Sequence, residues 1–118
     1  MNKRIFHVTQ QIEANLDRNW TVEMMAADAG LSVSHLHHAF RELIGMTPIA
    51  YVRERRLMTA FVLIVDQDCL DSIKEIAARC GCFDASDFTR DFKTKYGMTP
   101  TECKKQAEDD HQRNFPTE

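Results

Sequence analysis

The sequence predicts an all-α fold of seven helices, and three observations carry this prediction. Apolar residues recur at spacings of three and four along most of the chain. Four glycines and three prolines in 118 residues leave few tight turns for a β-fold, and no strand is expected. The tetrapeptide GMTP occurs twice, at 45–48 and 97–100. Gly ends helices in the left-handed conformation, and Thr-Pro suits the cap and first position of the next helix, so each copy predicts a helix stop followed by a helix start.

Three helices are expected before the first GMTP. Residues 4–18 form an amphipathic helix with Ile5, Val8, Ile12 and Leu16 on one face. Thr21 caps the second helix, and Trp20 and Met25 stand at the positions of a hydrophobic staple. This helix ends at Gly30. Ser32 caps the third, which ends at Gly45 and is expected to turn four residues inward: Val33, Leu36, Phe40 and Leu43.

A long fourth helix is expected from Pro48 to about Val65, followed by a polar loop, DQDCLD. Ser72 and Glu75 have the spacing of a capping box at the start of the fifth helix. Asp84 caps the sixth helix, which ends at Gly97. Its inward-facing residues are expected to be Ala85, Phe88, Phe92 and Tyr96. The seventh begins at Pro100 and fades near Gln106. The large side chains expected to be mostly buried are Trp20, Phe40, Phe61, Phe88 and Phe92.

The distribution of charge matters more than the net value of −3. Residues 108–118 carry four acidic side chains and one arginine, so the rest of the chain is neutral overall. Residues 31–65 hold four arginines against two glutamates, a local excess of two positive charges, and three histidines besides. A local basic patch is what phosphate binding requires, so the acidic net charge does not exclude a nucleic-acid partner.

The two halves of the chain repeat one pattern. Aligning residues 31–48 with 83–100, an offset of 52, gives six identities in eighteen positions. MAADAG at 25–30 matches IAARCG at 76–81 at an offset of 51, so one residue is inserted in the turn of the second copy. Both copies contain A-x-x-x-G, in which Ala lets two helices approach closely and Gly supplies the turn. This is the arrangement of a helix-turn-helix, whose second helix enters the DNA major groove. The alternative is a pair of packed helical hairpins without a nucleic-acid role, and the presence of two copies favours DNA binding.

From about residue 4 to 107 the chain resembles the DNA-binding domain of the AraC/XylS family of bacterial transcription regulators. The resemblance rests on LSVSHLHHAFRELIGMTPIAYVRERRLMTA and on SIKEIAARCGCFDASDFTRDFKTKYGMTP. It implies two helix-turn-helix subdomains, residues 1–47 and 66–107, joined by a linker helix at 48–65, with an acidic, disordered tail at 108–118. The recognition helices would be 33–44 and 85–96, entering successive major-groove segments. In length the chain resembles the stand-alone members of the MarA and SoxS kind, although a fragment of a longer regulator would look the same.

The resemblance also assigns DNA contacts by position. The base-reading side of the first recognition helix would be Ser34, His37, His38 and Arg41, and that of the second Ser86, Thr89 and Arg90. Arg90 is the strongest candidate for a guanine contact, because its planar fork matches the O6 and N7 edge. The phosphate side would be Ser32, Lys93, Lys95 and Thr99, since capping residues and helix N-termini meet phosphates.

The sequence departs from the family mainly in its second half. The second turn usually reads Gly-Phe, but here Gly81 is followed by Cys82, with Phe83 next. Either Phe83 occupies the same pocket or that pocket is underfilled. Cys103 stands where an aromatic residue is common. Asp84, Asp87 and Asp91 crowd the second recognition helix and repel phosphate, so the first unit is expected to supply most of the base discrimination.

No other chemistry is expected. The spacings of His35, His37 and His38 and of Cys80-x-Cys82 do not match those of structural zinc sites, and no nucleophile–base set or Gly-rich phosphate loop is readable. We therefore expect no enzyme, metal or cofactor. The absence of a long apolar run predicts a soluble, cytoplasmic protein, and the resemblance implies association with the bacterial nucleoid. The expected partners are a double-stranded DNA operator, bound as a monomer by a stand-alone chain, and RNA polymerase. The alternative is a protein-interaction module of the same fold whose DNA binding is weak or lost.

Overall fold

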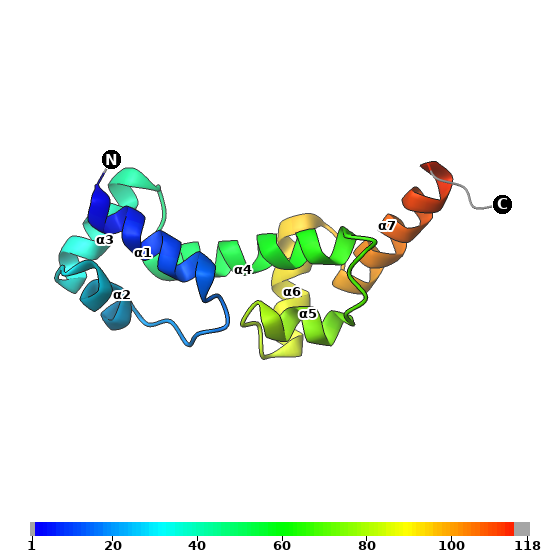
Figure 1. The fold of residues 1–118 in the computed structure, drawn as a ribbon, viewed down its shortest axis with the longest axis horizontal. Coiled ribbons are helices and arrows are strands. Elements are labelled where there is room, and N and C mark those ends of the chain that lie inside the picture. Colours follow the sequence, from blue (N-terminus) through cyan, green and yellow to red (C-terminus); the bar gives the residue numbers. More distant parts are fainter. Residues whose placement is uncertain (1, 115–118) are drawn as a thin grey trace. The chain divides into compact units, whose positions relative to one another are not determined.

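The computed structural model describes residues 2–114, and over this range it holds seven α-helices and no strand. The predicted fold class is confirmed. The chain divides after Arg55 into two compact units, which are described separately. The helices, labelled in Figure 1, are α1 (Lys3–Ala14), α2 (Val22–Ala29), α3 (Val33–Leu43), α4 (Pro48–Val65), α5 (Ile73–Arg79), α6 (Ala85–Tyr96) and α7 (Pro100–Asn114).

The first unit is built from α1, α2, α3 and the N-terminal half of α4 (Figure 1). Its core gathers the inward faces of these helices, and Val8, Ile12, Met25, Leu36 and Phe40 are fully buried there. The predicted staple residues Trp20 and Met25 both belong to this core. Ring packing ties α3 to α4, because Phe40 meets Tyr51 edge-on at 5.8 Å between ring centroids.

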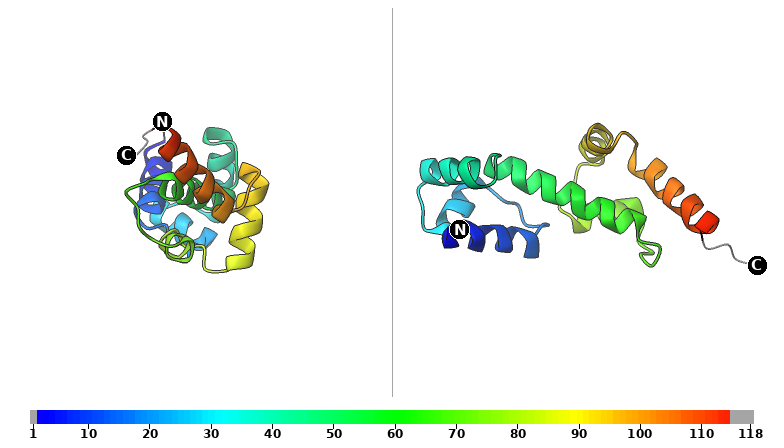
Figure 2. Two further views of the ribbon diagram at one scale, coloured as in Figure 1. Left: turned by 90° about the vertical axis from the view of Figure 1, so that its right-hand side faces the viewer. Right: turned by 90° about the horizontal axis from the view of Figure 1, so that it is seen from above.

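The second unit is built from the C-terminal half of α4 with α5, α6 and α7. Ala60 and Ile64 of α4 share a core with Ile76 of α5 and Phe92 of α6. Cys103 of α7 is 4% exposed and belongs to this core. The helix α4 is continuous (Figure 2) and supplies apolar residues to both cores.

Helix starts follow the caps that the sequence predicts. The side-chain oxygens of Thr21, Ser32, Ser72 and Asp84 each accept a hydrogen bond from the backbone N–H three residues ahead. Ser72 and Glu75 form the full capping box, with both bonds at 3.1 Å. Each of these bonds satisfies a donor that the first turn of a helix otherwise leaves unpaired.

Both copies of GMTP behave as predicted. Gly45 and Gly97 take positive φ values of 87° and 79°, which only glycine adopts without strain. The hydroxyl oxygen of Thr47 accepts from the Ala50 N–H at 3.2 Å, and that of Thr99 from the Glu102 N–H at 3.2 Å. The following prolines are the first residues of α4 and α7.

Two predicted helix ends were wrong. The first helix was expected to reach residue 18 but ends at Ala14, because the Asn15 N–H turns back to the Ile12 carbonyl. The seventh was expected to fade near Gln106 but continues to Asn114. The predicted disordered tail is therefore helical over 108–114, while 115–118 lie outside the described residues. A capping box at Thr99 and Glu102 starts α7, and no Gly or Pro interrupts it before Asn114.

The predicted burial was partly wrong. Trp20, Phe40, Phe88 and Phe92 are buried, but Phe61 is only half-buried. Three residues expected to face inward are exposed: Val33, Leu43 and Ala85. Val33 and Ala85 are the first residues of their helices, and Leu43 is the last residue of α3, so each lies beyond the reach of its core. Among residues 2–114, no helix is long and apolar enough to cross a membrane.

Candidate nucleic-acid interface

In the first unit, α2 and α3 meet at a tight turn centred on Gly30. Gly30 has φ 67°, and the Leu31 N–H donates to the Ala26 carbonyl at 3.0 Å, which closes the end of α2. An added Cβ at Gly30 would meet no atom closer than 3.9 Å, so backbone conformation rather than space demands glycine here. The Arg4 guanidinium of α1 donates to the Gly30 carbonyl at 3.0 Å and holds the turn against the first helix.

The second unit repeats this turn between α5 and α6. Gly81 has φ 82°, and the Cys82 N–H donates to the Ala77 carbonyl at 2.8 Å, as Leu31 does to Ala26. Ala26 and Ala77 are both buried. The capping residue then comes one position later than in the first unit, at Asp84. The repeat predicted from the sequence is thus the same helix pair built twice, with one residue inserted in the second turn.

Phe83 occupies that insertion and points outward. Its side chain is 71% exposed, so it does not swing into the pocket that the family's aromatic residue fills. Cys82 is half-buried and packs against the core in its place. A groove of about 480 Å³ lies beside it, lined by residues of α5, by Cys82 and Phe83 of the turn, and by Ala85, Phe88 and Thr89 of α6. The exposure of Phe83 argues against the first alternative raised by the sequence, a Phe83 side chain buried in that pocket.

The outer face of α3 carries the predicted base-side residues of the first unit. Ser34, His38 and Arg41 are exposed, and His37 is half-buried. Their spacing of three and four places them on one side of the helix, away from buried Leu36 and Phe40. Arg41 makes no ion pair with any of the residues described, so its charge faces solvent. Ser32, on the predicted phosphate side, accepts from the His35 N–H and keeps its own hydroxyl hydrogen for another acceptor.

The outer face of α6 carries Ser86, Thr89, Arg90 and Lys93, all exposed. It differs from α3 in one respect that the sequence analysis missed. The Arg90 guanidinium donates to the Asp87 carboxylate at 2.6 Å, and Asp91 lies 3.9 Å away. The i, i+3 spacing of Asp87 and Arg90 was the available signal. Asp87 therefore neutralises part of the charge on this face and also fixes where the guanidinium lies.

Two of the predicted phosphate contacts have partners within the protein. Thr99 is half-buried, donates its backbone N–H to the Glu102 carboxylate at 3.0 Å and accepts from the Glu102 N–H. Hydrogen bonds to the Glu102 carboxylate, first from the Thr99 backbone N–H and then from the Thr99 side chain, lower the pKa of Glu102, which stays ionised at the N-terminus of α7. Lys95 is exposed and its ammonium lies 5.4 Å from the centre of the Tyr96 ring. Whether Thr99 and Lys95 meet phosphate stays a prediction.

Within residues 2–114, no three His, Cys, Asp or Glu side chains gather in a way that could hold a metal ion. All four cysteines are free. Burial is the main cause that raises the pKa of Cys80, to about 11, and it also raises the pKa values of Cys82 and Cys103. These thiols are therefore small apolar groups of the second core.

A family model described as a helix-turn-helix domain matches residues 25–106. The crystal structure of a probable AraC family transcriptional regulator from Rhodopseudomonas palustris CGA009 is 30% identical and has a TM-score of 0.77, covering 89% of this chain and 97% of that one. The chain belongs to the AraC/XylS family. This conclusion agrees with the resemblance seen in the sequence.

Two further proteins are similar to the chain. The XylDLEGF operon transcriptional activator of Pseudomonas putida is 32% identical over 111 residues, which cover 90% of this chain and 35% of that protein. The chain spans about a third of the length of the curated relatives it matches. The DNA-binding domain of AdpA, solved in complex with a target DNA, has a TM-score of 0.83 at 23% identity, covers 98% of both chains and shares the fold.

Proposed function

We propose that the chain binds double-stranded DNA in a sequence-specific manner and regulates bacterial transcription. The observation that carries the proposal is the repeated helix pair. Each unit has a glycine turn, a capped second helix with its apolar side buried, and a polar outer side of that helix exposed to solvent. A face of this kind on the second helix of a helix-turn-helix is what reads base edges in the major groove.

The roles of the side chains follow from their chemistry. In the first unit, base contacts come from Ser34, His37, His38 and Arg41; in the second, from Ser86, Thr89 and Arg90. Phosphate contacts come from Ser32, Lys93, Lys95 and Thr99. Lys93 and Lys95 lie in the last turn of α6, where flexible ammonium groups suit a phosphate backbone more than a base edge.

The two units contribute unequally. The outer face of α3 has Arg41 unpaired among the described residues and carries a single acidic residue, Glu42. The outer face of α6 has Asp84 and Asp87 at its start, and Asp87 is paired with Arg90. Two carboxylates near the DNA oppose phosphate binding, so we assign most of the base discrimination to α3 and chiefly a backbone-holding role to α6, with Arg90 as its main base-reading side chain.

The same acidic face favours a second candidate function, a protein-interaction module of the same fold. Asp84, Asp87 and the partly exposed Asp91 form an acidic surface at the start and middle of α6. A basic protein partner would bind such a surface through complementary charge.

For the first proposal, a regulator bound to DNA, the protein partner that we propose is RNA polymerase, and the location that we propose is the bacterial cytoplasm.

Selection of bound duplexes from a randomised DNA library tests the proposal. We expect enrichment of one consensus sequence, and an affinity for it that falls steeply with salt as counterions are released. The double variant Arg41→Ala/Arg90→Ala should no longer enrich the consensus sequence, while its circular-dichroism spectrum should match that of the wild-type chain. Failure to enrich any sequence, together with no salt-dependent binding to duplex DNA, would leave the protein-interaction function in its place.

A further inference from the structure

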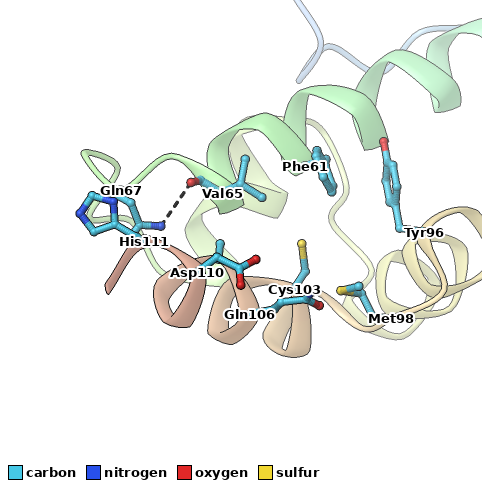
Figure 3. A pocket seen from close by; sticks show the side chains of 10 residues that line it. Phe61, Val65, Gln67, Tyr96, Met98, Cys103, Gln106, Asp110 and His111 are labelled. Carbon is cyan, nitrogen blue, oxygen red and sulfur yellow. Dashed lines mark hydrogen bonds between the residues drawn. The ribbon is translucent and has the colours of Figure 1, made fainter. Parts of the chain in front are cut away.

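A pocket of about 570 Å³ opens in the second unit beside α7 (Figure 3). The end of α4 and the following loop form one wall, the C-terminal end of α6 and the 97–99 turn form another, and α7 forms the third. The pocket exists because α7 continues past Gln106, and three of its lining residues, Ala107, Asp110 and His111, lie in that added length. None of the proposed DNA contacts lines it.

One end of the pocket is aromatic and apolar. The rings of Phe61 and Tyr96 are stacked with their centroids 4.6 Å apart, at 27° between their planes. Met98 and Cys103 add two sulfur atoms beside them (Figure 3). Phe61, which was predicted to be mostly buried, is only half-buried and lines this pocket. Flat apolar groups pack well against stacked rings of this kind.

The other end is polar and carries a carboxylate. Asp110 lies on the α7 wall, with Gln67 and His111 at the far side (Figure 3). The Gln67 amide donates to the Val65 carbonyl at 3.3 Å and is held against the end of α4. The Arg113 guanidinium lies 4.0 Å from Asp110, and both side chains are more than half exposed, so this ion pair leaves the carboxylate open to a competing cation.

We propose that this pocket binds a small amphipathic organic cation, a flat aromatic body with one protonated amine. A volume of about 570 Å³ falls within the range typical of small-molecule pockets. Asp110 supplies the anionic contact for the amine, and Phe61 with Tyr96 supplies the stacking surface for the ring. Lys95 sets the orientation of the ligand. Its ammonium lies over the Tyr96 ring and would repel the ligand's protonated amine at the aromatic end of the pocket. The amine therefore lies toward Asp110.

Three probes with one ring system and different charges test this site. 1-Naphthylmethylamine is a cation at pH 7, 1-naphthalenemethanol is neutral, and 1-naphthoic acid is an anion. Each is titrated into the ¹⁵N-labelled chain while amide chemical shifts are followed by NMR. We expect saturable shifts at pocket-lining residues, with the amine bound about two- to fivefold more tightly than the alcohol, the range for an exposed ion pair, and the acid bound most weakly.

Two variants separate the site from general charge attraction. Asp110→Asn should remove the preference for the amine over the alcohol, whereas Asp109→Asn, the same charge change one residue away and outside the pocket, should keep it. Ala107→Phe should fill the space and abolish saturable shifts from all three probes in a chain whose spectrum remains dispersed. The proposal is overturned by an absence of saturable shifts in the wild-type chain, by tightest binding of the acid, by equal effects of the two asparagine variants, or by unchanged binding to Ala107→Phe. No DNA enters the measurement, so its failure is separate from failure of the proposed function.

Discussion

At the scale of single residues, Arg90 is the side chain on which the proposed role of the second unit depends most. Its guanidinium is 68% exposed and lies on the outer face of α6, but it is paired with Asp87. An exposed pair of this kind contributes little to stability. The effect of the ion pair is instead on geometry, because it restricts the Arg90 side chain to a few of the conformations that it would otherwise sample.

Substitution of Arg90 separates base reading from phosphate binding. Arg90→Ala should cost about 1–3 kcal/mol of binding free energy on the preferred duplex and relax discrimination at one base position. Arg90→Lys keeps the charge but loses the planar fork, so it should relax the same position while recovering part of the affinity. Competition binding with all four base pairs at each position measures both effects. Equal weakening on every duplex would instead make Arg90 a phosphate contact.

Cys80 gives a prediction about reactivity. Burial raises its pKa to about 11, and the neighbouring Cys82 adds to the effect. Only about one molecule in a thousand then carries the thiolate at pH 8, and the thiolate is the nucleophile. Native protein treated with iodoacetamide at pH 8 should therefore remain unmodified at Cys80 by peptide mass spectrometry, and denatured protein should be fully modified. Rapid modification of the native chain would contradict this buried placement.

At the scale of helices, the sequence predicted where helices begin more accurately than where they end. The caps at Thr21, Ser32, Ser72 and Asp84 lie where expected, because each is a local hydrogen bond between residues three apart. Helices that end at glycine were also predicted correctly, since a positive φ is a property of one residue. The ends of α1 and α7 have no glycine, and polar composition misidentified a solvated helix as a disordered tail.

The candidate interface was also predictable in part from the sequence. Helical periodicity and the repeat placed Ser34, His38, Ser86 and Thr89 on exposed faces, since these faces oppose the buried ones. The pairing of Arg90 with Asp87 was signalled by their i, i+3 spacing but was missed. The outward direction of Phe83 could not be read from the pattern, because it follows from how the turn packs rather than from spacing.

The capping box of α7 predicts a change in stability with pH. The folded pKa of Glu102 is lowered, so its ionised form stabilises the folded chain above the unfolded pKa, and this contribution is lost as pH falls through the folded pKa. Glu102→Gln can keep the hydrogen bonds but removes the charge. Urea unfolding from pH 7 down to pH 3 should show the wild-type advantage over this variant shrinking with acid. A constant difference would contradict the assignment, and Glu108→Gln, on the same helix, serves as the control.

At the scale of the whole molecule, two cores share one helix. Phe40 is fully buried in the first core and Phe92 in the second. Either change to Ala should cost about 3–5 kcal/mol of unfolding free energy, because it removes a large apolar side chain and leaves a cavity. Phe40→Ala should raise amide hydrogen exchange mainly within residues 2–55, and Phe92→Ala mainly within 56–114. A uniform rise from either change would show that the two units open together.

The division of labour between the units is the central claim at this scale. Residues 31–65 carry a local positive excess and the outer face of α3 is nearly acid-free, while the second unit pairs its recognition arginine with an aspartate. Lys93 marks the backbone-holding role proposed for α6. Lys93→Ala should weaken binding to every duplex about equally and flatten the salt dependence by about one unit of slope.

The affinity of the wild-type chain for every single-base variant of its selected duplex, at two salt concentrations, tests this claim most directly. Contact assignment by Arg41→Ala and Arg90→Ala shows which half of the duplex each unit occupies. We predict that substitutions in the half assigned to α3 cost about 1–3 kcal/mol each, and that those in the other half cost less except at the position read by Arg90. Equal costs in both halves would contradict the asymmetry, and a duplex affinity that does not change with salt would contradict DNA binding itself.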